Sequence, residues 1–262
     1  MNGHLPCPNL FAGHDAGLYR LPDHITDPRR AHAALADPRA AAEPDMPPPD
    51  RLAETLALET IDALSAGRDR PDTTAVDRAR TAWQQHDDDL DVIRRAREQV
   101  ADIVTSRIRG DAERLILDTL APAHDQAVND FAGAWATLLG HGQTNPAQLI
   151  SAPARIRKAA ARVDQATDTY RAMWSVRHDL DAIGIRCADD PHGQYAAIRN
   201  PRDLVGPHAP LGRAPWRNLD TRAFLAWMTE HDGRLWMPTI DEQAQAAQAE
   251  PRVRHTFRPR SA

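Results

Sequence analysis

Lysine is almost absent from this chain, because Lys158 is the one lysine among 32 basic residues. We attribute this skew to a GC-rich coding genome, so abundant arginine is not read as a sign of phosphate binding. Aromatic residues are also scarce, at 5% of the sequence, and the mean hydropathy is −0.57. This composition favours amphipathic helices with irregular ends over a large α/β core.

Cysteine and long apolar runs are equally scarce. Cys7 and Cys187 are the only cysteines and stand far apart, so a disulfide framework is not indicated and a reducing compartment is the default. The N-terminus lacks a basic region followed by an apolar one, and no apolar run approaches the roughly 20 residues that span a bilayer. We therefore expect a cytoplasmic protein that does not contact membranes.

The sequence also lacks recognisable catalytic motifs. We find no Gly-x-Ser-x-Gly elbow, no glycine-rich phosphate loop and no Gly-x-Gly-x-x-Gly before a helix. The Glu-x-x-His pairs of di-metal bundles are missing too. We therefore expect no cofactor, although catalytic groups can converge from distant segments, so an enzyme is unsupported and not excluded.

A long helix is the dominant predicted element. After a helix over residues 51–65 that ends at Gly67, the chain runs from Asp72 to Leu120 without a proline and with one glycine, Gly110. A seven-residue repeat of apolar positions, broken only by His86 and Arg97, predicts a coiled-coil type seam. The apolar positions of this repeat are Val76, Ala79, Trp83, Leu90, Ile93, Val100 and Val104.

A second segment repeats this pattern. We expect Pro122 to interrupt the chain, a shorter helix over 124–140, and a further helix from about 153 to 183. The predicted fold is mainly α, an elongated antiparallel helical hairpin or coiled-coil-like bundle with the shorter helix near its tip or alongside. The heptad positions of the last helix are Ile156, Ala159, Val163, Ala166, Tyr170, Met173, Arg177 and Leu180.

Residues 184–245 are predicted to form a small C-terminal module. A turn signal between residues 185–187 and 195–198 predicts a β-hairpin. Helices are expected over 220–231 and from the capping box at Thr239 and Glu242 to about Ala249. The predicted organisation is an irregular proline-rich arm at 1–50, the bundle at 51–183, the α-plus-hairpin module at 184–245, and a polar then basic tail at 246–262.

These features favour a non-enzymatic assembly or adaptor protein. A structural or accessory component of a larger particle, such as that of a phage or another mobile element, would suit the design. We expect a protein partner, or self-association, through the seam. The candidate interaction residues are Trp83, His86, Leu90, Ile93, Arg97, Val100, Tyr170 and Met173.

Two alternatives belong to other functional classes. A metal-dependent enzyme could use His86 with the aspartates at 87–89, or the turn that carries Cys187, Asp189 and His192. Successive helical residues turn by about 100°, however, so three adjacent aspartates cannot converge on one ion. A nucleic-acid binder could use the last twelve residues, which carry no acid. The basic residues of that tail are Arg252, Arg254, Arg258 and Arg260.

Overall fold

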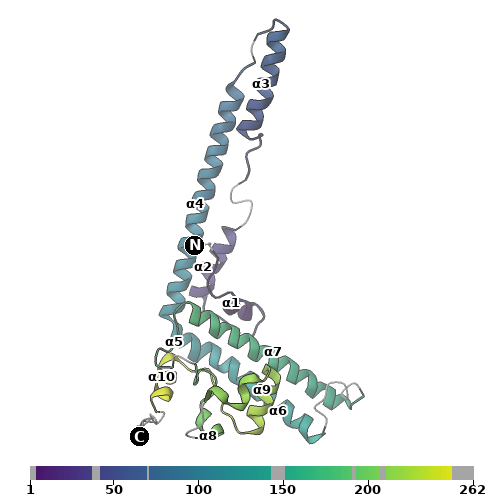
Figure 1. Ribbon diagram of the computed structural model, residues 1–262, viewed down its shortest axis with the longest axis vertical. Helices are drawn as coiled ribbons and strands as arrows, with labels where there is room; N and C mark the ends of the chain where they lie inside the picture. Colours follow the sequence, from purple (N-terminus) through teal and green to yellow (C-terminus); the bar gives the residue numbers. More distant parts are fainter. Residues whose placement is uncertain are drawn as a thin grey trace, which may run out of the picture. The chain divides into compact units, whose positions relative to one another are not determined.

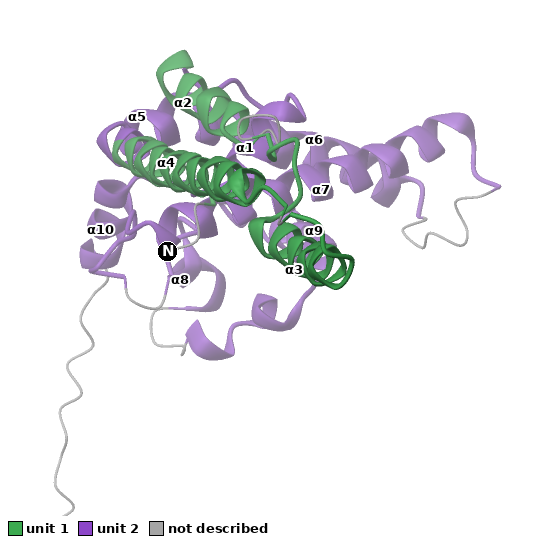
Figure 2. Cartoon of the chain, turned by 90° about the horizontal axis from the view of Figure 1, so that it is seen from above, with its two compact units in different colours: residues 1–5, 23–106 green, residues 6–22, 107–262 purple. Residues whose placement is uncertain are grey.

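The structure is a computed structural model that describes residues 4–36, 42–69, 71–142, 151–190, 193–206 and 211–249. Over these ranges the protein is mainly helical and contains no β-strand, which confirms that the fold is mainly α. The chain divides into two compact units (Figure 2). The first unit is residues 1–5 and 23–106, and the second unit is residues 6–22 and 107–262.

The first unit contains two helices whose ends match the sequence signals. Gly67 adopts φ +67° after α3 (Pro49–Ser65), and the amide of Arg68 donates to the Ala63 carbonyl at 2.7 Å. Before α4, the Asp72 carboxylate accepts hydrogen bonds from the amide (2.9 Å) and the hydroxyl of Thr74. The helices of this unit are α2 (Asp23–Ala34), α3 (Pro49–Ser65) and α4 (Thr74–Gly110), whose last four residues belong to the second unit (Figure 1).

The chain changes helical geometry just after α4, next to Gly110. The predicted interruption at Pro122 is wrong. This proline lies in the first turn of α6 (Ala121–Gly140), and the π-helical turn η2 (Leu115–Leu120) precedes it without a break in the helix. The segments are α5 (Ala112–Arg114), η2 (Leu115–Leu120) and α6 (Ala121–Gly140).

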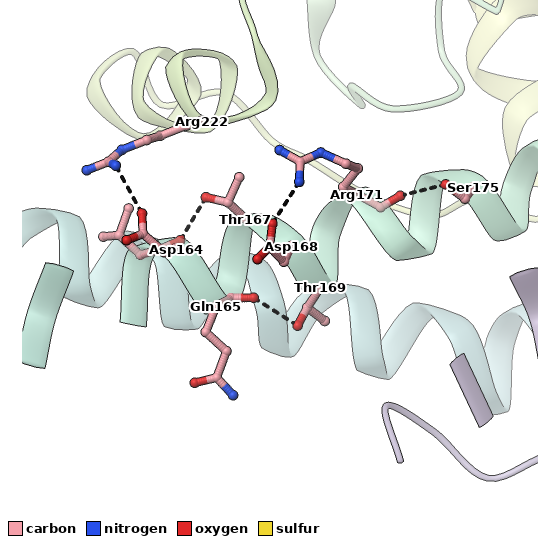
Figure 3. A network of polar contacts seen from close by, with 9 residues as sticks. Asp164, Gln165, Thr167, Asp168, Thr169, Arg171, Ser175 and Arg222 are labelled. Atoms are coloured by element: carbon pink, nitrogen blue, oxygen red, sulfur yellow. Dashed lines mark hydrogen bonds and ion pairs between the residues drawn. The ribbon is translucent and has the colours of Figure 1, made fainter. Parts of the chain in front are cut away.

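The core of the second unit lies between α6 and α7 (Ala154–Ala182), which pack along each other, with α9 (Thr221–Glu230) against both. All eight heptad positions of α7 are buried. Trp135 of α6 donates to Glu230 at 2.9 Å. Figure 3 shows Arg222 of α9 reaching Asp164 of α7, at 3.0 Å. We predicted that α7 folds back on α4. This pairing involves both units, and it stays a prediction.

The N-terminal arm is not irregular, so that prediction is wrong for residues 8–15 and 23–34. Helix α1 (Pro8–Asp15) packs on α7, and Asp179 of α7 caps it. The Asp179 carboxylate accepts from the amides of Asn9 and Leu10 at 2.7 and 3.4 Å. A helix of eight residues depends on tertiary contacts for its stability, and a local pattern does not reveal them. Pro28 lies inside α2 (Asp23–Ala34).

The Cys7 thiol at the start of α1 predicts a loss of stability at alkaline pH. Burial, and then the nearby Asp179 charge, raise its pKa from 9.0 to about 12. A raised pKa favours the neutral thiol in the folded state, so its contribution is complete below pH 9 and is lost as pH rises toward 12. We expect urea midpoints to fall between pH 9 and 10.5, and to fall less steeply in Cys7→Ser, whose hydroxyl does not titrate there. Equal slopes for both proteins would contradict this assignment.

The predicted β-hairpin at 185–198 is wrong. In the described residues, Ile198 instead makes an isolated antiparallel bridge with Leu235, and the Asp190 carboxylate accepts from the amides of Gln194 and Tyr195. The helices predicted over 220–231 and after Thr239 are confirmed, including the Thr239–Glu242 capping box, with distances of 2.9 and 3.2 Å. The elements here are α8 (Pro201–Val205), η4 (Leu211–Arg213), η5 (Pro215–Asn218), α9 and α10 (Ile240–Ala249).

Candidate functional sites: an apolar helix face and a polar pocket

The predicted seam of α4 is mostly its less exposed side. Trp83 donates through Nε1 to the Met46 carbonyl at 3.3 Å, and its ring meets that of His86 edge-on at 5.7 Å. Leu90 departs from the pattern, because it is exposed. The other α4 residues predicted for the seam are half-buried: Ile93, Arg97 and Val100.

The two seam residues predicted on α7 lie inside the second unit. Tyr170 and Met173 are both buried. The Tyr170 ring lies 5.3 Å from that of His124 on α6 and 6.1 Å from that of Phe224 on α9. These side chains therefore hold helices of one unit together and do not present a surface to another molecule.

The aspartates beside His86 are engaged separately along the helix. Asp88 accepts from Gln84 at 3.3 Å and Asp89 from Gln85 at 2.9 Å. Within the ranges that the structure describes, no three histidine, cysteine, aspartate or glutamate side chains are arranged to hold a metal ion, and no helix is long and apolar enough to cross a membrane.

The other predicted metal ligands do not form a common site among the described residues either. Cys187 is buried, while Asp189 is exposed and accepts from Gln248 of α10 at 3.0 Å. His192 lies outside the described residues, as do all four arginines predicted to make the basic tail: Arg252, Arg254, Arg258 and Arg260.

Helix α3 presents a large apolar face that sequence reasoning missed. Leu58, Ile61 and Leu64 are 66%, 61% and 55% exposed, and their spacing of three places them on one side of the helix. Leu56 is half-buried and Ala63 is buried. The sequence signal for this face was a second row of apolar residues, Leu58, Ile61 and Leu64, beside the row that contains Leu56 and Ala63. We call Leu58, Ile61 and Leu64 the α3 face.

No family model, no curated protein and no solved structure matches this chain.

Charge is divided unequally between the units. The sequence of the first unit carries eighteen acidic and eleven basic side chains, a net charge of −7, whereas the second carries nineteen and twenty-one, a net charge of +2. Glu54, Glu59 and Asp62 make the surroundings of the α3 face acidic. On α7, three exposed basic side chains share one side of the helix at spacings of three and four. We call Arg155, Lys158 and Arg162 the α7 stripe.

A polar pocket of about 490 Å³ lies at the C-terminal end of α7, between this helix, the loop that follows it and α10. Its lining contains two arginines and two aspartates with small side chains between them. Most of these groups come from the end of α7 and the loop that follows it, and Gln243 of α10 is the lining residue from a separate segment. The charged lining residues are Arg177, Asp181, Arg186 and Asp190.

One hydrogen-bonded chain crosses the pocket wall. The Gln243 amide of α10 accepts from Arg177 Nη2 at 3.2 Å and donates to Asp190 Oδ2 at 2.8 Å. Asp190 also accepts from the amides of Gln194 and Tyr195, each at 2.8 Å. Asp190, which is buried, thus has several donors for its two oxygens, and Gln243 is fixed in one orientation.

The Arg177 guanidinium makes fewer hydrogen bonds than its N–H groups allow, although the residue is only 3% exposed. Its Nε lies 3.5 Å from Asp181 Oδ1, and these two atoms, together with Arg177 Nη1, are buried without a hydrogen bond. Burial lowers the pKa of Arg177 and opposes the effect of Asp181. Burial also raises the pKa of Asp181, against Arg177, His178 and Arg186. The charge of Arg177 is therefore held away from water without full compensation, whereas the Asp181 side chain keeps 40% of its surface exposed.

Proposed function

We propose that this chain is a non-enzymatic assembly protein that associates with further copies of itself through the α3 face. The observation that carries the proposal is the exposure of Leu58, Ile61 and Leu64. Large apolar side chains gathered on one helix side are typical of an interaction surface. We further propose that α3 and α4 form an elongated, coiled-coil-like antiparallel hairpin that presents this face.

The proposed occupant of the α3 face is the α7 stripe of a second copy. Two α3 faces would bring their acidic surroundings together, and like charges repel. Arg155, Lys158 and Arg162 offer the opposite charge, and the aliphatic stems of such side chains can cover apolar surface. A contact between two different surfaces of the same chain propagates from copy to copy, which suits a component of a larger particle, such as one encoded by a phage or mobile element, assembled in the cytoplasm.

Sedimentation velocity over a range of concentrations tests the proposal. We expect wild type to associate and to dissociate as salt rises, because salt screens the attraction. Replacing Leu58, Ile61 and Leu64 with glutamine should raise the dissociation constant by about tenfold or more, since the apolar contribution is lost. The matched control replaces three exposed leucines of the second unit with glutamine and should leave association unchanged. These control positions are Leu117, Leu139 and Leu219.

The charged half of the contact has its own pair of variants. Replacing Arg155, Lys158 and Arg162 with glutamine should weaken association and flatten its salt dependence. The same change at Arg78, Arg80 and Arg94, which are exposed on α4, should not weaken it. A wild-type chain that stays monomeric at all concentrations would overturn the proposal. Association that survives the α3 variant, or that requires added DNA or RNA, would overturn it as well.

A further inference from the structure

Helix α4 carries a second row of mostly apolar side chains, on a different side from the predicted seam. Val92 and Ile103 are 63% and 38% exposed. Between them, Ala96 is half-buried and Gln99 is exposed. At about 100° per residue, these four positions fall within roughly 60° of one another around the helix. Their spacing alternates between four and three residues, as on one side of a coiled coil. We call Val92, Ala96, Gln99 and Ile103 the α4 stripe.

One edge of the α4 stripe carries a charge of each sign. Arg95 and Asp102 each stand directly before a residue of the stripe, seven positions apart, and both are exposed. Within the described ranges, neither side chain makes an ion pair or a hydrogen bond. They are too far apart along the helix to pair with each other, since such pairs form at spacings of three or four. Arg94, on the opposite side of α4, pairs instead with Asp91 at 3.0 Å.

The order of these charges is self-complementary in an antiparallel pair of helices. Arg95 and Asp102 lie at nearly equal distances on either side of the middle of the stripe. A two-fold axis through that middle brings Arg95 of each copy opposite Asp102 of the other, and Val92 opposite Ile103. In a parallel pair the two charges would stay about 10 Å apart along the axis and could not meet. The charges therefore favour a second copy of α4, in the antiparallel direction, as the partner of the stripe.

We propose that copies of this chain pair antiparallel through the α4 stripe, with Arg95 of each copy bound to Asp102 of the other. The inference rests on the proposed function. The stripe is roughly 17 Å long, so its contact is small beside the roughly 1,200–2,000 Å² of stable interfaces. The pairing therefore forms where the α3 face has already gathered copies at a high local concentration. A two-fold contact added to a propagating one joins two files of copies.

Disulfide cross-linking between two differently tagged copies of the full chain tests the pairing. Ala96→Cys in one copy and Gln99→Cys in the other lie opposite each other beside the two-fold axis. We expect mild oxidation to join them at concentrations where wild type associates. Arg94→Cys with Gln99→Cys is the control and should give no such product, because Arg94 lies on the opposite side of α4. The native Cys7 and Cys187 are buried and common to both mixtures. Absence of the cross-link, or an equal yield in the control, would overturn the pairing.

Charge reversal in both tagged copies tests the direction and register of the pair. Arg95→Glu places carboxylates opposite each other, and Asp102→Arg does the same with guanidinium groups. Because like charges repel across an interface, each single change should reduce the cross-link to the level of the control. Both changes in one chain restore opposite charges and should restore the cross-link. Single changes without effect, or a double change that does not restore the yield, would overturn the assigned pairing.

The α3 variant separates this inference from the proposed function. When Leu58, Ile61 and Leu64 are replaced with glutamine, we expect the cross-link to be lost together with association. Association through the α3 face without the cross-link would overturn the α4 pairing alone. A charge-dependent cross-link that the α3 variant leaves unchanged would support the pairing and overturn the proposed function instead.

Discussion

Replacing Leu138 with alanine is expected to destabilise the second unit by about 2–5 kcal/mol, as for other buried leucines. The Leu138 side chain is 0% exposed, whereas its neighbour Leu139 is 44% exposed. The same replacement at Leu139 is expected to change stability by no more than about 0.5 kcal/mol. The two positions share chemistry and helix, so intrinsic helix propensity cancels and only burial differs.

The measurement is urea unfolding followed by tryptophan fluorescence. Trp135 lies in the core cluster that includes Leu138 and stacks on Phe131 at 5.7 Å between ring centroids, so its emission reports on this core. Comparable losses of stability at the two leucines would mean that α6 does not bury the side that we describe against α7.

Asp190→Ala is the second change with a large expected effect. Asp190 is 7% exposed and accepts from Gln194, Tyr195 and Gln243. Its loss would leave several buried donors without an acceptor, and each such group costs about 1–3 kcal/mol. We expect a destabilisation of about 3 kcal/mol or more, because hydrogen bonds to a charged group are the stronger kind.

Asp189→Ala is the matched control, since the neighbouring Asp189 is exposed and accepts from Gln248, which is also exposed, at 3.0 Å. Its expected effect is within about 0.5 kcal/mol. Differential scanning calorimetry of both variants provides the comparison. If Asp190→Ala and the control have the same melting temperature, the turn after α7 is held by something other than the Asp190 carboxylate.

Elements defined by neighbouring residues were predictable from the sequence. The cap at Asp220, whose carboxylate accepts from the amide of Ala223 at 2.8 Å, and the box at Thr239 and Glu242 are signals contained within four residues. The heptad positions of α7 were predictable for a similar reason, because burial on a long helix repeats with the helical period.

Elements defined by distant residues were not predictable. Helix α1 depends on Asp179, and the loop after α7 depends on Gln243 of α10. The polar pocket was missed for the same reason, although an arginine at a buried heptad position, Arg177, was a visible irregularity. The α3 face was missed because Leu58, Ile61 and Leu64 span only seven positions, which is too short a stretch to establish a seven-residue repeat.

The cap that Asp179 provides to α1 also sets an order of events during synthesis. Asn9 and Asp179 are 170 residues apart. At about 5–20 residues per second, the ribosome needs roughly 10–30 s to cover that distance. Helix α1 therefore leaves the ribosome long before its cap exists, and its buried side chains Leu10 and Phe11 await α7. The second unit is completed by a segment made early and docked late, so its N-terminal residues are where a nascent chain is most open to chaperones.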